Sequence, residues 1–496
     1  MNTQKKSSIT PWAIGIALFC GALVGVLILG LIGAIITTKR AEVSSIFNNK
    51  KVDIVGIEPK SAVWGLNFPR EYRTWSKTAE MNFSSKHLGN KPEDILESRP
   101  NMVVLWAGYA FSRSYKAPRG HWYTLEDVYN SLRVGAPGIG DAKDLQPSTC
   151  WTCKSPDVPR RMQEIGIAEF YKEPWSANGT EIVNPLGCAD CHNPADMELT
   201  ITRPGLIEAF QRQGKDVTQA GEQELRSLVC AQCHVEYYFK GDGKYLTLPW
   251  DKGMTVEQME EYYDELEYFD YVHAISKTPI IKAQHPDYEI FLMGPHGQKN
   301  LSCADCHMPY ISEGGIKYSN HQVMSPLANV SSTCAICHRD TESELIAYVY
   351  ERQDKVIELR DRLEPELVRA HVLVKAAMDA GATDEELLET RKLIRAAQWR
   401  WDYIVASHGA SFHAPLESAR VLSHGIDKAL QAQLLIKDVL FAHGVTGEVP
   451  MPDLSTKANA QQYVNLDMPL LESQKAQFVE TIVPQWLQVA KENGRI

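Results

Sequence analysis

The sequence has no cysteine available for a disulfide bridge between distant segments. Ten of its 11 cysteines fall in Cys-x-x-Cys pairs, and the remaining one, Cys20, lies in an apolar run. The pairs are Cys150 with Cys153, Cys188 with Cys191, Cys230 with Cys233, Cys303 with Cys306, and Cys334 with Cys337. This many cysteines in an exported chain would ordinarily indicate disulfides, but one repeated spacing indicates sites that bind a cofactor.

The sequence also lacks an excess of basic residues. Its 51 lysines and arginines face 62 aspartates and glutamates, which gives a net charge of −11, and no basic stripe runs along it. A partner rich in phosphate groups needs such a stripe, so we expect no nucleic acid among the ligands. A small anionic substrate requires a pocket that is positive locally.

No charged side chain occurs in residues 12–37. This run is long enough to cross a hydrocarbon core of ~30 Å and longer than the ~7–15 apolar residues of a signal peptide. Lysines and an arginine flank it, and no small-x-small cleavage site clearly ends it. We therefore expect residues 1–40 to be a transmembrane signal anchor, with a cleaved export signal as the alternative. Both place the rest of the chain on the periplasmic side of the cytoplasmic membrane.

Four of the five cysteine pairs are followed at once by a histidine. Cys-x-x-Cys-His attaches c-type haem: the two thiols bond to the porphyrin and the histidine binds the iron on one face. A single copy would also fit a redox dithiol or half of a zinc site. Four copies with histidine at the same offset favour haem, and the haems then form much of the interior. The motif histidines are His192, His234, His307 and His338.

Each of these four haems requires a second axial ligand on its iron. Haem iron that transfers electrons prefers a strong sixth ligand, whereas an open sixth position permits substrate chemistry. The chain has 15 histidines, of which 15 − 4 = 11 lie outside the motifs. That is enough for four distal partners, but spacing alone does not pair them.

The fifth pair is followed by Lys154, in the stretch "CWTCK". The lysine has three interpretations: a replacement in a haem that is ligated from elsewhere or missing, a surface lysine after a redox dithiol, or an amine that binds iron. Coordination requires the neutral amine, although a free lysine titrates near about 10.4, so metal binding and burial must keep the proton off. One unusual haem beside bis-histidine haems is the natural candidate for substrate binding.

The stretch "CWTCKSPDVPR" (150–160) resembles the active-site haem motif of the pentahaem cytochrome c nitrite reductases, which reduce nitrite to ammonia. That family has the same order of one Cys-x-x-Cys-Lys and four Cys-x-x-Cys-His. Similar blocks are "RGH" (119–121), "LRVGAP" (132–137), "CAQCHVEYYF" (230–239), "KAQHP" (282–286) and "RWDYIVASHGASFHAP" (400–415). The resemblance covers roughly residues 50–490 and implies five covalently bound haem c groups.

The resemblance implies catalytic roles for three side chains. Lys154 is then the proximal ligand of the first haem, and Arg133, Tyr237 and His285 face its open position. The chemistry of these residues agrees. Arg133 supplies positive charge for a small anion, His285 suits proton delivery near neutral pH, and Tyr237 adds a hydroxyl donor.

The resemblance also implies the remaining ligands. The distal haem ligands are His121, His296, His321 and His413, with His408 as the substitute for the last. One calcium ion near the first haem is bound by the side chains of Glu236 and Gln284 and by the carbonyls of Tyr237 and Lys282, a set of hard oxygens. Histidines without a matching role, expected at the surface or in the core, are His87, His273, His371, His424 and His443.

The C-terminal third has a helical pattern. From about residue 341, apolar residues recur at three-, four- and seven-residue steps, which predicts a long amphipathic helix that Pro365 should kink or shift in register. Further helices are predicted over 383–407, with an N-cap threonine, and over 414–444. Only residues 102–111 are predicted as a possible strand.

We therefore expect a mainly α multihaem cytochrome c fold with a haem-packed core, few short strands and long C-terminal helices. Its regions are the N-terminal segment 1–40, a pentahaem catalytic region 41–340 and a long-helix region 341–496. In the family that the sequence resembles, the long helices form a homodimer interface, and a small quinol-oxidising multihaem cytochrome of the membrane donates electrons.

Two other functions fit part of the pattern. A multihaem electron carrier without catalysis would make Lys154 incidental. A related multihaem reductase or oxidase acting on sulfite or hydroxylamine would use the same pocket residues. The spin state of the haems separates the first alternative from nitrite reduction, and assays with each substrate separate the second.

Overall fold

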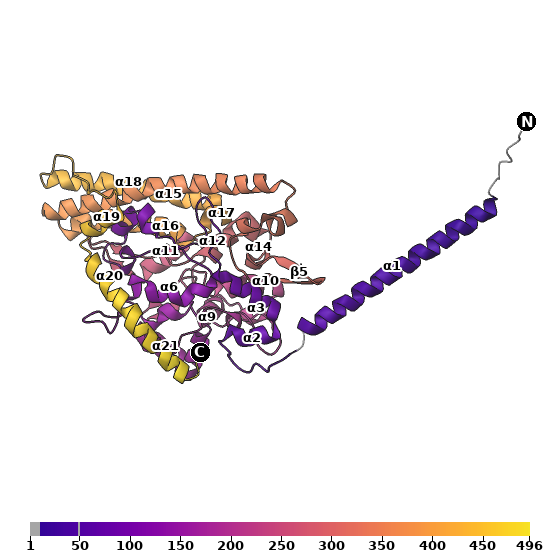
Figure 1. Cartoon of the computed structure of the whole chain (residues 1–496). Helices are drawn as coiled ribbons and strands as arrows, with labels where there is room; N and C mark the ends of the chain where they lie inside the picture. The colour runs from indigo at the N-terminus through magenta and orange to yellow at the C-terminus, as the bar shows by residue number, and fades with distance from the viewer. Residues whose placement is uncertain (1–9, 48–49) are drawn as a thin grey trace, which may run out of the picture.

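A computed structural model describes residues 10–47 and 50–496, so Lys5 and Lys6 lie outside the described residues. Its first helix, α1 (Pro11–Phe47), has an 18-residue window of mean hydropathy 2.7 with none of it buried. Figure 1 shows α1 extending away from the rest of the chain. Length and composition thus allow this helix to cross a membrane, and a signal sequence passes the same test.

The haem-motif region consists of short helices joined by turns. These helices are α2 (Ser61–Asn67), α3 (Pro69–Ser76), α4 (Ile95–Ser98), α5 (Asn101–Leu105), α6 (Thr124–Asn130), α7 (Asp157–Ile165), α8 (Ile167–Lys172), α9 (Pro204–Arg212), α10 (Glu222–Ala231), α11 (Val256–Glu265), α12 (Asp287–Met293), α13 (Pro295–Gln298) and α14 (Cys303–His307). Several attachment motifs form single tight turns within this framework, as at Ser148–Trp151, Cys188–Asp190 and Cys334–Ile336.

Strands occur only as three small antiparallel hairpins in the described residues. They are β1 (Tyr238–Lys240) with β2 (Tyr245–Thr247), β3 (Tyr271–Val272) with β4 (Pro279–Ile280), and β5 (Tyr310–Glu313) with β6 (Ile316–Ser319). Helix accounts for 59% and strand for 6% of the structure, which confirms the mainly α fold with few short strands.

Residues 102–111 are not a strand, so that prediction was wrong. They form α5 (Asn101–Leu105) followed by a turn, and Met102 to Ala107 are fully buried. A short apolar run that is buried on all sides has the same pattern as a buried strand. Here the segment packs against the long helix α15 and against α19, and these contacts stabilise it as a helix.

The predicted long helices are present. They are α15 (Glu342–Asp379), α16 (Asp384–Ala406) and α18 (Pro415–Ala442), with the short α17 (Ala410–His413) between the last two. α15 and α16 each begin with a capping box, in which two side chains accept hydrogen bonds from each other's backbone N–H. The pairs are Thr341 with Glu344 in α15 and Thr383 with Glu386 in α16. α15 runs through Pro365 as one helix.

The apolar stripes of the long helices form core. α15, α16 and α18 pack through small and aliphatic residues, and α15 and α18 lie side by side in Figure 1. A Cβ at Gly425 would lie 2.7 Å from Leu363 Cδ2, so glycine permits this close approach of α18 to α15. The residues of this cluster are Ala370, Leu373, Val374, Ala377, Leu387, Ile394, Ala432, Ile436 and Leu440.

The C-terminal segment crosses back over the haem-motif region. It contains α19 (Lys457–Tyr463), α20 (Met468–Gln477), a π-helical turn (Phe478–Ile482) and α21 (Val483–Glu492), which ends near α2 in Figure 1. Pro484 has no N–H to donate, which explains the wider turn before it. The segment covers the elements around Lys154, because the Trp486 ring packs against Trp175 at 5.5 Å.

Candidate functional site

The turn that carries Lys154 is fixed at both ends. Lys154 N–H donates to Trp151 O at 2.9 Å, and Thr124 Oγ1 donates to Lys154 O at 2.8 Å. The Trp151 ring is fully buried and stacks on Trp175 with centroids 4.8 Å apart. The sequence after Cys150 therefore forms a rigid turn and not a mobile surface loop.

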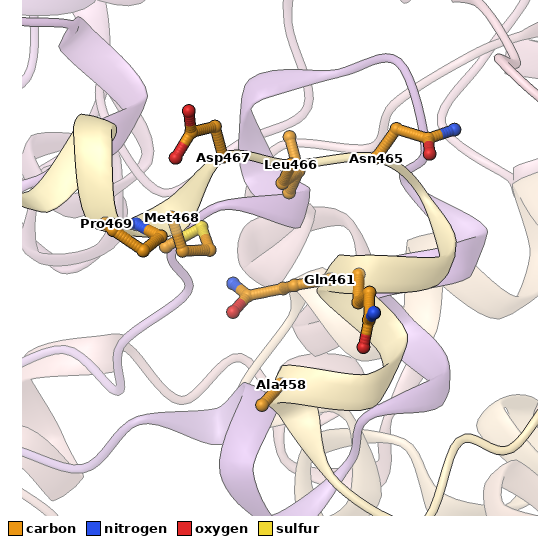
Figure 2. Close-up of a pocket in the computed structure, with 8 residues that line it drawn as sticks. Ala458, Gln461, Asn465, Leu466, Asp467, Met468 and Pro469 are labelled. Atoms are coloured by element: carbon orange, nitrogen blue, oxygen red, sulfur yellow. The ribbon is translucent and has the colours of Figure 1, made fainter.

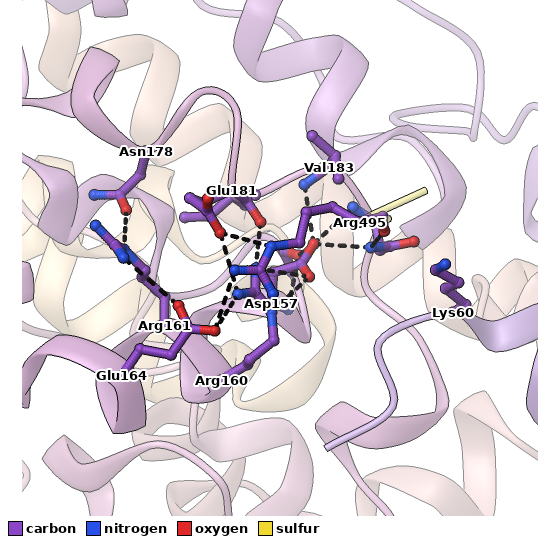
Figure 3. A network of polar contacts seen from close by, with 12 residues as sticks. Lys60, Asp157, Arg160, Arg161, Glu164, Asn178, Glu181, Val183 and Arg495 are labelled. Atoms are coloured by element: carbon purple, nitrogen blue, oxygen red, sulfur yellow. Dashed lines mark hydrogen bonds and ion pairs between the residues drawn. The ribbon is translucent and has the colours of Figure 1, made fainter. Parts of the chain in front are cut away.

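A buried carboxylate holds the chain directly after this turn. Asp157, the first residue of α7, accepts hydrogen bonds from Val183 N and Asn184 N, both at 2.9 Å. Around it, Arg160 and Arg495 both form ion pairs with Glu164 and Glu181, as Figure 3 shows. The C-terminus thereby supports the start of α7.

Arg133, Tyr237 and His285 lie near this turn. Tyr237 and His285 have ring centroids 6.4 Å apart, and the charge of Lys154 acts on His285. Arg133 follows Ser131, whose hydroxyl accepts from Arg133 Nε at 3.1 Å, and its guanidinium lies 4.6 Å from the Phe111 ring centroid. Segments far apart in sequence thus bring a phenol and an imidazole together, and the charge of Arg133 acts on the Cys150 thiol of the lysine turn.

Burial sets the protonation of two of these groups. It lowers the pKa of His285 well below its ordinary value, and the positive charge of Lys154 lowers it further. It raises the pKa of Tyr237 well above its ordinary value, with smaller contributions from nearby thiols. The imidazole is therefore neutral and the phenol keeps its proton near neutral pH.

Six of the predicted haem ligands lie opposite one another in three pairs. The ring centroids are 6.1 Å apart for His192 and His321, 6.2 Å for His307 and His413, and 6.3 Å for His296 and His338. Two imidazoles on opposite sides of one metal ion, each at about 2 Å from it, hold their centroids roughly 6 Å apart. The geometry therefore fits one iron between the members of each pair.

Two further predicted haem ligands, His121 and His234, are also neighbours, since the charge of His234 acts on His121. Burial and, to a smaller extent, the neighbouring His234 and Lys154 lower the pKa of His121 to about 4. His234 Nδ1 lies 3.4 Å from Asp287 Oδ2, and Asp287 Oδ1 accepts from Ser407 Oγ at 2.6 Å. This carboxylate, which the sequence did not single out, orients the ring of His234.

Further contacts leave the second ring nitrogen of several histidines free for a metal. Nδ1 is bonded to a backbone carbonyl in His192 (Met197 O, 2.8 Å), His307 (Met324 O, 2.9 Å) and His321 (Ser319 O, 2.9 Å). Metal-binding histidines are commonly oriented by such a bond. Burial also lowers the pKa of His321 and His413 to about 4, so both rings are neutral, the form that binds metal.

The paired thiols are unbridged and lie close to one another. All 11 cysteines are free in the structure. The thiol of Cys153 neighbours that of Cys233, and the thiol of Cys230 neighbours that of Cys303. The motifs are thus in contact, so the donor set and its spacing fit a row of c-type haems. Each of the five cysteine pairs would attach one haem.

The predicted calcium ligands are also together. Glu236 Oε2 accepts from Gln284 N at 2.6 Å, and the Gln284 amide group donates to Lys282 O at 3.0 Å. The Glu236 carboxyl is fully buried, and burial with the nearby Glu289 and Asp270 raises its pKa well above the ordinary range. A cation would stabilise this buried negative cluster, so the oxygen set fits calcium.

No group of three or more His, Cys, Asp or Glu suited to a metal occurs among residues 10–47 and 50–496. The calcium set has a single carboxylate, so amide and backbone oxygens must complete it. Calcium accepts such ligands readily, with six to eight oxygens at about 2.3–2.6 Å.

The side chain of Lys282 has a role that the sequence did not reveal. Its ammonium is 1% exposed and pairs with Asp402 Oδ1 at 2.9 Å. It also lies 4.8 Å from the Phe111 ring centroid, on the ring that Arg133 contacts as well. Lys282 therefore connects the segment with the predicted calcium ligands to α16, through Asp402, and to the Phe111 ring that Arg133 also contacts.

The remaining histidines occupy surface and core positions, as expected. His273 and His371 are fully buried and stack with centroids 3.7 Å apart. His87 and His443 form surface contacts with Asp354 and Glu386. Among the candidates near α17, the ring that faces His307 is that of His413, and His408 lies 6.4 Å from the Tyr115 ring.

A hollow of about 550 Å³ lies between α19 and the start of α20, as Figure 2 shows. Its lining includes Gln461, Asn465 and Asp467, and none of the predicted site residues. The candidate site is therefore the region around Lys154 and not this hollow.

The sequence matches the cytochrome c552 family over residues 60–494. The chain belongs to this family. It is 59% identical over 482 residues to cytochrome c-552 of Bacteroides fragilis, covering 97% of this chain and 98% of the relative. It is 56% identical over 491 residues to cytochrome c-552 of Porphyromonas gingivalis, covering 99% and 98%.

The cytochrome c552 fold also agrees with a solved structure. The catalytic subunit of cytochrome c nitrite reductase from Desulfovibrio desulfuricans, a structure that concerns two calcium sites, superimposes with a TM-score of 0.75 and 31% identity. The match covers 80% of this chain and 90% of that subunit. The resemblance seen in the sequence is thereby confirmed at the level of family and fold.

Proposed function

We propose that this cytochrome c552 is a periplasmic, ammonia-forming nitrite reductase whose active site is the haem attached at Cys150 and Cys153 and ligated by Lys154. The observation that carries the proposal is the pair of Tyr237 and His285 near the one attachment turn that lacks a histidine, with Arg133 acting on Cys150 of the same turn. The similarity to a cytochrome c nitrite reductase of known structure supports it.

The three side chains divide the work. Arg133 binds the anion through its guanidinium. The chain as a whole carries a net charge of −11 and would repel nitrite, so the site needs this local positive charge. The His285 imidazole and the Tyr237 phenol are placed to hydrogen-bond to the nitrite oxygens. The neutral imidazole would relay protons to the oxygens that leave as water, accepting a proton at one ring nitrogen as it donates from the other. Burial excludes bulk water from this exchange.

The first haem, when bound, supplies the electrons and an open iron position at which nitrite is reduced. His121, His296, His321 and His413, together with the four motif histidines, would hold the other four haems, which would supply a path for electrons to the first. The centroid distances of 6.1–6.3 Å in three pairs support the assignments of His296, His321 and His413. Contacts between the motifs support a continuous path for electrons.

The test is an assay with a reduced dye as electron donor. We expect six electrons consumed and one ammonium formed per nitrite, and one high-spin haem among low-spin haems in the oxidised protein. Parallel assays with sulfite and hydroxylamine decide the substrate. If all haems are low-spin and neither nitrite nor cyanide alters the spectrum, the protein is an electron carrier instead.

We propose that calcium binds at Glu236 and Gln284 with the carbonyls of Tyr237 and Lys282. The ion would join the segments that carry Tyr237 and His285, since Gln284 directly precedes His285. The hydrogen bonds already linking these groups support one shared site. The related nitrite reductase structure, which has two calcium sites, adds support.

Replacing Glu236 by glutamine is expected to release calcium and to lower kcat by about 10–100-fold, because the two catalytic segments lose their common anchor. Metal content measured by mass spectrometry and the haem count report the two effects separately. Glu289→Gln is the matched control: this buried carboxylate accepts from Glu236 N at 2.8 Å but is no proposed ligand. Equal calcium loss in both variants would contradict the assignment.

We propose a homodimer formed through the long helices. Support comes from large apolar side chains that α18 leaves exposed although its other face is core. Exposed apolar patches of this kind mark protein contacts. Sedimentation of the purified protein is expected to give twice the mass of the chain. The exposed residues are Leu416, Leu430, Leu434, Leu435 and Phe441.

We propose that α1 remains as an anchor in the cytoplasmic membrane and that a quinol-oxidising multihaem cytochrome of that membrane donates the electrons. The length and hydropathy of α1 support the anchor. N-terminal sequencing of the purified protein distinguishes it from a cleaved signal, after which the protein would be soluble in the periplasm.

A further inference from the structure

Arg203 is a buried cation that the proposed chemistry does not use. It directly precedes α9 and its side chain is 1% exposed. Arg203 Nε donates to Thr152 O at 2.6 Å and Nη2 donates to Ser155 O at 2.9 Å. These carbonyls flank Cys153 and Lys154, so one guanidinium holds the lysine turn from both sides.

The same guanidinium is paired with the second attachment motif. Arg203 Nη2 forms an ion pair with Asp190 Oδ1, and Asp190 is 2% exposed. Asp190 lies between Cys188 and Cys191, and its other oxygen accepts from Gly187 N at 2.8 Å. Separating such a buried pair would leave an uncompensated charge, so the two motifs are held in fixed relation.

The third motif joins at the same point. Gln232, between Cys230 and Cys233, accepts through Oε1 from Thr202 N at 2.9 Å and from Arg203 N at 3.2 Å. Its amide nitrogen donates to Asp190 O at 2.8 Å. The segment Thr202–Arg203 therefore bonds to all of the first three attachment motifs.

We propose that Arg203 is a positioning residue that holds the Lys154 turn in register with the second and third attachment motifs. The lysine amine is then presented to the iron of the first haem at a fixed height, and the first three haems keep their spacing. This rests on the proposed ligation by Lys154. Only arginine suits the position, because its planar fork of donors reaches Thr152 O, Ser155 O and Asp190 at once, whereas lysine offers a single point charge.

The test compares Arg203→Lys and Arg203→Gln with wild type in the haem-loaded protein. We expect five attached haems by mass in R203K but an altered electron paramagnetic resonance signal of the first haem, recognised in wild type by its response to nitrite or cyanide. We also expect kcat to fall by roughly 100-fold, the effect of misplacing a reacting group by about 1 Å. R203Q, which also leaves Asp190 unpaired, should show the larger spectral change.

The matched control is Arg400→Gln. Arg400 is equally buried at 4% exposure and forms a two-pronged pair with Glu260 at 2.9 and 2.8 Å, away from any attachment motif. R400Q should lower the melting temperature and leave the first haem's signal unchanged. If R400Q changes the signal of the first haem to a similar extent, the effect of the Arg203 variants is a general loss of stability, and the proposal is overturned.

The remaining outcomes are also decisive. A wild-type signal in R203K and R203Q overturns the positioning role. If R203Q fails to acquire haem, R203K, which keeps the charge, decides alone. A wild-type protein without a ligand-responsive haem contradicts the proposed function itself and is distinguished from failure of this inference by that first spectrum.

Discussion

Replacing His285 by asparagine is expected to lower kcat for nitrite by roughly 10²–10⁴-fold, the range for loss of a proton-transferring group, while all five haems stay attached. Asparagine keeps a polar side chain of similar reach but cannot pass a proton. His285 lies 6.4 Å from Tyr237 between ring centroids, so the phenol remains as a weaker donor and some activity survives. Steady-state assays and haem counts by mass measure the two quantities.

The control for this variant is His87→Asn, at a partly buried histidine that contacts Asp354 at 2.7 Å far from the motifs. It should leave kcat unchanged. An equal loss of haem and activity in His285→Asn would assign that histidine a structural role and remove it from the proton path.

Replacing Arg133 by glutamine is expected to lower kcat/KM for nitrite by roughly 10²–10³-fold, the effect of removing one charged donor from a buried site. The guanidinium is held by Ser131 and by the Phe111 ring, so it is already oriented before the anion arrives. Arg133→Lys keeps the charge but loses the fork and should be intermediate.

Arg212→Gln serves as the control for Arg133. It removes a surface arginine that pairs with Asp251 at 2.7 Å, and it should change neither kcat nor KM. If Arg133→Gln leaves kcat/KM for nitrite unchanged, the anion is bound by another group, for which the buried ammonium of Lys282 is the nearest candidate.

The sequence predicted some parts of the candidate site directly and others only through family resemblance. The attachment cysteines and motif histidines could be read directly, because covalent attachment requires them at adjacent positions. The distal histidines came only from family resemblance. His192 and His321 are 129 residues apart (321 − 192), and no local pattern links them, although the structure brings their centroids to 6.1 Å.

Residues that act through buried side chains escaped prediction. Asp287 orients His234, Asp402 pairs with Lys282, and Arg203 holds the lysine turn. Each is a common charged residue whose surroundings give no sign of burial in the sequence. The prediction for residues 102–111 was wrong for another reason: this short apolar run has the composition of a strand, but it contains most of helix α5.

The sequence by itself determined the five attachment sites, the long helices and the apolar N-terminal run, because each depends on neighbours within one turn or one periodic stripe. The tertiary structure alone decided which imidazoles face each other, how Tyr237 comes to lie beside His285, and how Arg203 joins three motifs. Those arrangements depend on contacts between segments tens to hundreds of residues apart, and packing of the whole chain fixes them.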